Sequence, residues 1–309
     1  MQNNIILPRN LAGFMELLPN EQIAFNKILD SFRAVFETNA FLPMDTPTLE
    51  LSSVLLAKAG GETEKQVYRF SKGDTDMCMR FDLTVPLAKF VALNSAMLSF
   101  PFKRYQIGKS YRGERSQKGR FREFYQCDVD IIGEDQLSII SDAEIIDVLM
   151  SALKSIGLSD ILVKISNRRL ISGFLESLDI DEKSGDVLRL IDKIDKIGMD
   201  LFKEEMAAIG LFDKTEKLLE FLSISGNDEE TFLKLDNLKI DNQKWNNGLS
   251  ELKAVFDALK SFGEDKNNYV LDIKTVRGLD YYTGTVFETI SKSHPEFGSI
   301  GGGGRYENL

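Results

Sequence analysis

Apolar residues recur every three or four positions in several segments of the chain, which is the spacing of one face of an α-helix. The pattern predicts helices over residues 20–39, 86–97 and 141–156. The first of these ends shortly before Phe41, where the spacing changes. The chain is therefore expected to hold separate helices with β-structure between them.

Other segments alternate apolar and polar residues with a period of two, as strands with one buried face do. This alternation marks residues 104–108 and 121–126, and the polar residues 115–120 between them form the loop of a predicted hairpin. Further strands are expected at residues 67–70, 77–81, 270–273 and 285–290. Because consecutive strands come in hairpin-like pairs, we expect an α+β fold with an antiparallel sheet flanked by helices.

The composition of the chain changes over residues 170–263. This segment is rich in Lys, Asp, Glu and Leu, has helical periodicity and contains no proline. We interpret this segment as an inserted helical domain, and a plain helical appendage is the alternative. The expected organisation is a first part of a core over 1–169, the helical domain over 170–263, and a second part of the core over 264–309.

Composition narrows the class of protein. The 309 residues carry a formal net charge of −10 and are 43% hydrophobic, as in a globular protein of about two domains. No apolar run approaches the roughly 20 residues that cross a bilayer, and the N-terminus lacks the features of a secretory signal. We therefore expect a cytoplasmic protein without a membrane partner. An acidic chain repels nucleic acid at long range, so any RNA contact needs a local basic surface.

Cysteine and histidine are scarce. Cys78 and Cys127 lie far apart in strand-like surroundings and without metal-ligand spacing, so two buried free thiols are expected. His294, the only histidine, precedes a proline in a turn-like connection and is expected at the surface. Neither HExxH nor CxxC occurs, so the sequence has no zinc signature, and the single histidine excludes a Ser-His-Asp triad elsewhere.

Residues 103–126 concentrate five arginines and three lysines in this acidic chain. The planar guanidinium group binds phosphate or carboxylate oxygens in pairs and stays charged at neutral pH. In the predicted hairpin, Arg112, Arg120 and Arg122 point to one side or to the mouth of the loop. From these residues alone, two interpretations stay open: a local anion site, or a solvated face balanced by neighbouring glutamates.

Five segments of the chain carry motifs: FLPMDTPTLE at 41–50, MRFDLTVP at 79–86, YRGERSQKGRFREFYQ at 111–126, VRGLDYYTG at 276–284 and GGGGRY at 301–306. In this order they resemble the motifs of histidyl-tRNA synthetases, a family of class II aminoacyl-tRNA synthetases. The first resembles the first class motif, the second is similar to the segment that holds the substrate amino group, and the third resembles the arginine-bearing class motif. The last two resemble the two histidine motifs of the family. Five ordered matches are more specific than any one alone.

The resemblance implies that histidine reacts with ATP to form histidyl-adenylate and pyrophosphate and is then transferred to the 3′ end of tRNA(His). The carboxylate of histidine is already a nucleophile, so positioning and charge neutralisation carry the catalysis. By resemblance, Arg112 contacts the α-phosphate and Arg277 stabilises the charge that develops there, so both are expected to be catalytic. ATP is also expected to contact Glu114, Arg120 and Phe124, the last by stacking on adenine, with Mg²⁺ bridging its phosphates.

The same resemblance assigns the residues around the substrate histidine. Asp82, Thr84 and Gln126 match residues that hold the α-ammonium group, and Asp130 matches the acidic residue that contacts the imidazole. The expected histidine-binding set is Asp82, Thr84, Gln126, Asp130, Arg277, Tyr281, Tyr282, Gly304 and Tyr306. Carboxylate and phenol groups in a dry pocket pair with both imidazole nitrogens and discriminate strongly. A glycine beside the ligand lets the main chain approach where a Cβ atom would intrude.

Alternatives remain for single residues and for the whole chain. Taken alone, Phe124 reads as a core residue and Arg277 as the partner of Asp272 or Asp280 in a salt bridge. The regulatory subunit of ATP phosphoribosyltransferase has the same fold and binds histidine as a sensor. A pseudo-synthetase module that binds tRNA without chemistry is a third possibility. The presence of Arg112, Arg277 and the histidine-contacting residues together favours the enzyme.

The resemblance also implies partners and missing parts. Family members form a homodimer through the first class motif, and their helical insertion, matched by residues 170–263, closes over the acceptor arm of the tRNA. They continue into a third class motif and an anticodon-binding domain. We therefore expect this chain to represent the catalytic region without these parts.

Overall fold

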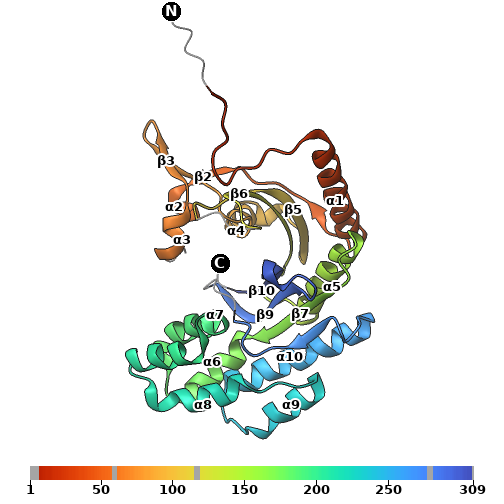
Figure 1. Cartoon of the computed structure of the whole chain (residues 1–309). Helices are drawn as coiled ribbons and strands as arrows, with labels where there is room; N and C mark the ends of the chain where they lie inside the picture. Colours follow the sequence, from red (N-terminus) through yellow and green to blue (C-terminus); the bar gives the residue numbers. More distant parts are fainter. Residues whose placement is uncertain (1–6, 58–60, 115–118, 277–280, 308–309) are drawn as a thin grey trace, which may run out of the picture. The chain divides into compact units, whose positions relative to one another are not determined.

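The structure, a computed structural model, describes residues 7–57, 61–114, 119–276 and 281–307 (Figure 1). The chain divides into two compact units, an N-terminal unit, Met1–Gln136, and a C-terminal unit, Leu137–Asn308. Each unit has its own sheet structure and its own helices.

Within its described residues, the N-terminal unit contains two sheets. One has the strand order β1-β5-β6, formed by Leu42–Pro43, Phe102–Tyr111 and Glu123–Ile132. The other has the order β2-β4-β3, formed by Leu49–Leu51, Thr75–Met79 and Arg69–Lys72. The helices of this unit are α1 (Pro19–Thr38), α2 (Ser52–Leu55), α3 (Gly61–Gln66) and α4 (Thr84–Asn94), with a 3-10 turn η1 (Ser95–Met97).

Two of the predicted helices fall in this unit. Helix α1 matches the predicted 20–39 to within one residue at each end. Helix α4 begins at Thr84, two residues before the predicted start, because Oδ1 of Asp82 accepts a hydrogen bond from the backbone N–H of Val85 at 3.2 Å. Pro86 fits this first turn because a backbone donor there has no partner within the helix.

The long hairpin β5–β6 extends further than the alternation predicted. The two strands pair antiparallel over ten residues each, from Phe102 opposite Ile132 to Tyr111 opposite Glu123. The predicted strand at 121–126 begins too early, because the backbone N–H of Arg122 donates to the carbonyl of Gly13 at 2.8 Å and not to β5. The hairpin nevertheless carries most of the predicted site in this unit.

The C-terminal unit contains a sheet of order β10-β9-β7-β8. Its strands are β7 (Ile161–Asn167), β8 (Tyr269–Leu271), β9 (Tyr282–Ser291) and β10 (Ser299–Tyr306). Its helical elements are α5 (Ile140–Ser155), α6 (Arg168–Ser177), η2 (Asp181–Lys183), α7 (Ser184–Ala208), α8 (Phe212–Leu222), α9 (Asp228–Asn237), α10 (Gln243–Phe262) and η3 (Pro295–Phe297). Helix α5 matches the predicted 141–156, and β8 and β9 fall on the predicted strands at 270–273 and 285–290. Every regular element between β7 and β8 is helical.

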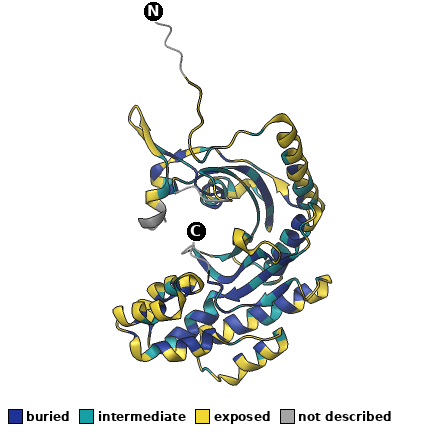
Figure 2. Cartoon of the chain, viewed as in Figure 1, coloured by how far each residue is buried: buried dark blue, intermediate teal, exposed yellow. Residues whose placement is uncertain are grey.

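Strand β7 forms the centre of this sheet, between β8 and β9. Its alternate residues Ile161, Val163 and Ile165 are fully buried. Helices α6 and α10 pack on each other, α10 also contacts β7 and β9, and α6 contacts β9. Figure 2 shows the buried residues gathered on the sheet strands and along α6 and α10, whereas α8 and α9 carry many exposed residues.

The expected α+β class is confirmed, with one difference in the sheets. Most strand pairs are antiparallel, but β1 and β5 pair parallel, as do β7 and β8. Both parallel pairs join strands that are separated by helices along the chain, and parallel strands require such long crossovers. In the part of the chain that is described, no helix has the length and apolar character needed to span a bilayer.

Candidate functional site

One face of the β5–β6 hairpin gathers polar residues from both strands. Residues directly opposite each other in an antiparallel pair project to the same face of the sheet. The opposed pairs on this face are Arg104 with Asp130, Gln106 with Asp128, Gly108 with Gln126 and Ser110 with Phe124. The sequence analysis had selected Phe124, Gln126 and Asp130, and the register places them together on one surface.

Arg112 follows β5 directly and is half-buried beside this face. Its backbone N–H donates to the carbonyl of Arg122 at 2.9 Å, and its Nε donates to the carbonyl of Phe81 at 3.1 Å. The central carbon of its guanidinium group lies 5.1 Å from the ring centroid of Phe124, within cation–π range. Phe124 is half-buried. Its ring is therefore partly open and lies under a cation, unlike the ring of a fully buried core residue.

Asp82 occupies the turn before α4 and is 4% exposed. Burial raises the pKa of its carboxyl group to about 6, although the N–H of Val85 and the charge of Arg112 act in the opposite direction. Its second oxygen, Oδ2, is buried and has no hydrogen-bond partner among the described residues. A buried acceptor without a donor is costly, so this position suits a ligand that brings an N–H group. The neighbouring Thr84 is buried at the start of α4.

Strand β6 carries a second group of buried acceptors. Within the described residues, Oε1 of Gln126 is buried without a hydrogen-bond partner. Oδ2 of Asp130 lies 2.5 Å from Nη2 of Arg104 in an ion pair. Burial raises the pKa of Asp128 to about 7; Arg104 and Arg112 lower it, and Asp130 and Asp82 raise it further. The face therefore combines several buried carboxyl groups with two arginines.

The remaining arginines of the hairpin are placed differently. Nε of Arg122 donates to the carbonyl of Glu114 at 3.1 Å, and its Nη1 donates to the carbonyl of Ala12 at 3.4 Å. The backbone at Gly13 passes so close that a Cβ atom there would lie 2.8 Å from Cγ of Arg122. Arg122 therefore fixes the N-terminal segment to the hairpin. Arg120 is exposed, and residues 115–118 of the predicted loop lie outside the described residues.

Part of the charge along β5 belongs to a solvated surface. Nζ of Lys109 pairs with Oε1 of Glu123 at 2.8 Å, and the side chain of Lys109 is 41% exposed. The two interpretations of the arginine-rich segment thus apply to different residues: Lys109 and Glu123 balance each other at the surface, and Arg112 lies beside the polar face.

The predicted tyrosines meet in the C-terminal unit. Tyr306 on β10 is directly opposite Tyr282 on β9. The ring of Tyr281 lies 4.7 Å from that of Tyr282 and 6.0 Å from that of Tyr306, measured between centroids. Tyr282 is 9% exposed. Three phenol rings therefore form one cluster, and all three belong to the residues assigned to histidine by resemblance. Arg277, assigned to the same motif, lies outside the described residues, and so does its proposed salt bridge.

Gly304 is required by the packing of this cluster. A Cβ atom at this position would lie 2.6 Å from the carbonyl oxygen of Thr285 and 2.8 Å from Cδ1 of Tyr282. The sequence analysis expected this glycine to let the main chain approach a ligand, whereas the atoms that exclude a Cβ here belong to the protein itself. Strand β10 is also anchored by Arg305, whose Nη2 lies 2.7 Å from Oδ1 of Asp142 on α5.

Sequence reasoning missed Arg104, Gln106, Ser110 and Asp128. All four share the polar face of the hairpin with the predicted residues, and Arg104 is 0% exposed. The signal was present in the sequence, because the same period of two that predicted the strands also places alternate residues on one face. These four residues lie outside the residues that the family motifs assign to ligands, so the resemblance did not indicate them.

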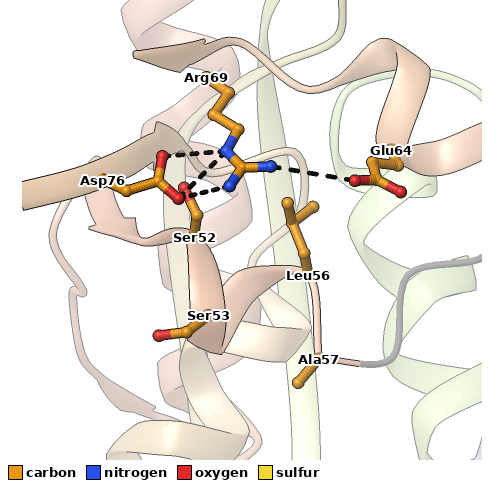
Figure 3. A pocket seen from close by; sticks show the side chains of 7 residues that line it. All are labelled: Ser52, Ser53, Leu56, Ala57, Glu64, Arg69 and Asp76. Carbon is orange, nitrogen blue, oxygen red and sulfur yellow. Dashed lines mark hydrogen bonds and ion pairs between the residues drawn. The ribbon is translucent and has the colours of Figure 1, made fainter. Parts of the chain in front are cut away.

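The described residues also form a shallow pocket away from this face, shown in Figure 3. Its lining is Ser52, Ser53, Leu56, Ala57, Glu64, Arg69 and Asp76. Nε of Arg69 donates to Oδ1 of Asp76 at 2.9 Å, so the cation in this pocket is already paired. None of the predicted site residues lines it.

The cysteines and the histidine are placed nearly as expected. Both cysteines are free; Cys78 is buried, and Cys127 is half-buried, which is more open than expected. Burial raises the pKa of the Cys127 thiol to about 12. His294 is exposed and lies 3.3 Å from Glu296 through Nδ1.

Comparison with known proteins gives consistent results. The family model for histidyl-tRNA synthetase matches residues 13–309. A histidine-tRNA ligase of Clostridium tetani (strain Massachusetts / E88) is 51% identical over 310 residues, which cover 100% of this chain and 70% of the relative. The crystal structure of a histidyl-tRNA synthetase from Nostoc sp. PCC 7120 matches with a TM-score of 0.90 and 34% identity, over 99% of this chain and 70% of that one.

A structure described as an ATP phosphoribosyltransferase regulatory subunit/histidyl-tRNA synthetase from Bacillus halodurans C matches with a TM-score of 0.84. It is 22% identical over 98% of this chain and 77% of that one, which shows a shared fold only. The sensor alternative thus fits less well than the synthetase. Taken with the motifs, the hairpin face and the tyrosine cluster, these matches show that the chain belongs to the histidyl-tRNA synthetase family.

Proposed function

We propose that this chain activates histidine with ATP, forming histidyl-adenylate and pyrophosphate, and transfers the histidyl group to the 3′ end of tRNA(His). The observation that carries the proposal is a pair of buried acceptor oxygens without a described partner, one on Gln126 in the polar face of the hairpin and one on Asp82 in the turn before α4. Such oxygens suit the α-ammonium group of an amino acid, which donates three hydrogen bonds.

The chemistry needs a positioned nucleophile and a stabilised phosphate. The histidine carboxylate attacks the α-phosphorus of ATP, the new C–O–P linkage forms, and the bond to pyrophosphate breaks. No proton has to be removed from the nucleophile, so a general base is unnecessary. In our proposal Arg112 binds the α-phosphate oxygens, because its guanidinium group is anchored through a backbone carbonyl and remains cationic. Arg277 is proposed to stabilise the same charge.

The adenine ring is proposed to lie on Phe124, which sits under the guanidinium group of Arg112 at the end of the hairpin. Glu114 and the exposed Arg120 are proposed to contact other parts of ATP. Magnesium enters with ATP as part of the substrate complex. Among the described residues, no group of three or more Asp, Glu, His or Cys side chains is arranged to hold a metal ion.

Recognition of histidine is proposed to use several residue groups. Asp82, Thr84 and Gln126 bind the α-ammonium group, and Asp130 accepts a hydrogen bond from the imidazole. In the C-terminal unit, the proposed contacts to histidine come from Tyr281, Tyr282, Gly304 and Tyr306. The close packing of the tyrosine rings supports this role, because rigid aromatic groups discriminate shape at low entropic cost.

The proposal also includes a second copy of the chain and a tRNA as partners. A homodimer through the first class motif is supported by exposed leucines on two short strands, Leu42, Leu49 and Leu51, at 61%, 45% and 51% exposure. The helices within 170–263 are proposed to contact the acceptor end of tRNA(His). The proposed compartment is the cytoplasm.

Histidine-dependent exchange of pyrophosphate into ATP tests the proposal. The assay is run on this chain, on Arg112→Met as a matched negative control, and on the Clostridium tetani ligase as a positive control. Exchange that requires histidine and is lost in Arg112→Met supports the synthetase. Histidine binding without exchange would favour the sensor, and RNA binding with steep salt dependence but neither histidine binding nor exchange would favour a pseudo-synthetase.

A further inference from the structure

Arg104 is a fully buried arginine on the polar face of the hairpin. Its side chain is 0% exposed, and its Nη2 lies 2.5 Å from Oδ2 of Asp130 in an ion pair. None of its three guanidinium nitrogens forms a hydrogen bond of good geometry with a described residue. Burying a guanidinium group is costly unless carboxylates offset it. Arg104 therefore depends on the carboxyl groups around it, and they depend on Arg104.

Several carboxyl groups lie close to Arg104 and to one another. Asp128 and Asp130 are two residues apart on β6, so they share a face, and both Asp130 and Asp82 raise the pKa of Asp128. Arg104 and Arg112 are the positive charges that lower the pKa of Asp128, and the neighbouring Cys127 thiol is also titratable. Without Arg104, this face would hold two carboxyl groups, with Asp82 nearby, and burial would favour their neutral forms.

We infer that Arg104 is a positioning residue of the histidine pocket: through its ion pair it holds the Asp130 carboxylate oriented toward the substrate imidazole, and it also offsets the charge of the neighbouring Asp128. This inference rests on the proposed function, since it assigns Asp130 to the imidazole. It adds two residues, Arg104 and Asp128, that share the hairpin face with the proposed contacts.

The chemical reason is that a carboxylate and a carboxylic acid recognise imidazole in opposite ways. An ionised Asp130 accepts a hydrogen bond from an imidazole N–H, and a protonated one donates instead. A pocket that selects the N–H therefore requires the charged form. The ion pair with Arg104 also restricts rotation of the carboxylate, so the accepting oxygen is held before the ligand arrives.

Calorimetric titration of this chain with histidine, and separately with ATP, tests the inference. Arg104→Met keeps most of the buried volume and removes the cation. We expect its dissociation constant for histidine to rise at least about tenfold, or about 1.4 kcal/mol, with the constant for ATP within about twofold of wild type. The loss of histidine affinity in Arg104→Met, measured against wild type at the same pH, should become smaller from pH 6.5 to pH 9. At high pH the carboxyl groups of this face lose their protons even without the cation.

Asp128→Asn provides the charge-compensating control. If Arg104 acts by offsetting the charge of Asp128, adding Asp128→Asn to Arg104→Met removes the repulsion between Asp128 and Asp130. The double variant should then bind histidine at least about threefold more tightly than Arg104→Met. Arg104→Lys keeps a cation without the planar fork and should bind histidine better than Arg104→Met. A purely structural role predicts no recovery in the double variant and no dependence of the defect on pH.

The outcomes separate this inference from the proposed function. If wild type binds no histidine, the proposed function fails and the inference with it. If wild type binds histidine and folded Arg104→Met binds it equally well, or loses histidine and ATP alike, only the inference is overturned. If Arg104→Met does not fold, the test uses Arg104→Lys and Asp128→Asn. The inference is overturned if histidine affinity depends on pH in both variants as it does in wild type.

Discussion

The guanidinium carbon of Arg112 lies 5.1 Å from the ring centroid of Phe124. The two residues come from the two strands of one hairpin, because Arg112 follows β5 and Phe124 is the second residue of β6. A cation held over an aromatic ring suits a ligand that is flat at one end and anionic at the other. A nucleotide has this shape, which is the reason the pair is central to the proposed ATP site.

Phe124→Leu should weaken ATP binding and leave histidine binding nearly unchanged. Leucine fills much of the volume but offers neither a face for adenine nor a cation–π partner for Arg112. Such contacts contribute about 0.5–2 kcal/mol, so we expect the KM for ATP to rise roughly 2- to 30-fold in the exchange assay. A larger effect on the KM for histidine than for ATP would contradict the assignment of Phe124.

Gly304→Ala should destabilise the protein and reduce histidine affinity. The added Cβ atom would lie 2.6 Å from the carbonyl of Thr285 and 2.8 Å from Tyr282, so the strand or the ring must move. Overpacking of this kind costs about 1–3 kcal/mol. Thermal unfolding and histidine titration measure the two effects. The control is Gly185→Ala, where a Cβ atom would meet nothing closer than Arg189 at 3.8 Å; equal effects in both variants would refute the packing argument.

Arg305→Met should destabilise the C-terminal unit strongly. Arg305 and Asp142 form an ion pair with side chains only 10% and 8% exposed, and Arg305 also donates to the carbonyls of Leu137 and Ser138. Removing one partner of a buried pair costs about 3–5 kcal/mol, because the other charge is left without compensation. Urea unfolding should therefore shift to a lower midpoint.

An exposed pair provides the comparison for Arg305. Arg33 and Asp30 lie 2.6 Å apart, but their side chains are 44% and 69% exposed. Arg33→Met should change the free energy of unfolding by no more than about 1 kcal/mol. Adding Asp142→Asn to Arg305→Met should restore part of the loss. If the double variant is no more stable than the single one, the uncompensated charge is not the cause.

Asp128→Asn should change how stability depends on pH. An unfolded aspartate has a pKa of about 3.9, whereas burial raises the pKa of Asp128 to about 7 in the folded state. Between these values the folded protein binds more protons, so the free energy of unfolding falls as pH rises from about 4 to about 7. The variant should gain stability over wild type at pH 8 and gain least near pH 4. A difference that is the same at both pH values would contradict the burial of Asp128.

Local patterning predicted several elements of the fold. Helices α1 and α5 appear where the helical spacing places them, because one apolar stripe is enough to specify a helix that packs on a sheet. The start of α4 was misjudged, since a side-chain acceptor at Asp82 begins the helix before the proline does. The parallel pairing of β7 with β8 could not be predicted either, because it joins strands separated by the whole helical segment.

The sequence by itself determined the family, the strands of the hairpin and most proposed site residues, because ligand chemistry restricts which residue types can occupy those positions. Only the tertiary structure revealed that Arg104 is buried against Asp130, that Arg122 binds backbone carbonyls, and that Gly304 is demanded by Tyr282 and Thr285. These facts depend on strand register and on contacts between residues far apart in the chain. A charge or a glycine acquires its role from the atoms that packing brings beside it, and local sequence does not contain that information.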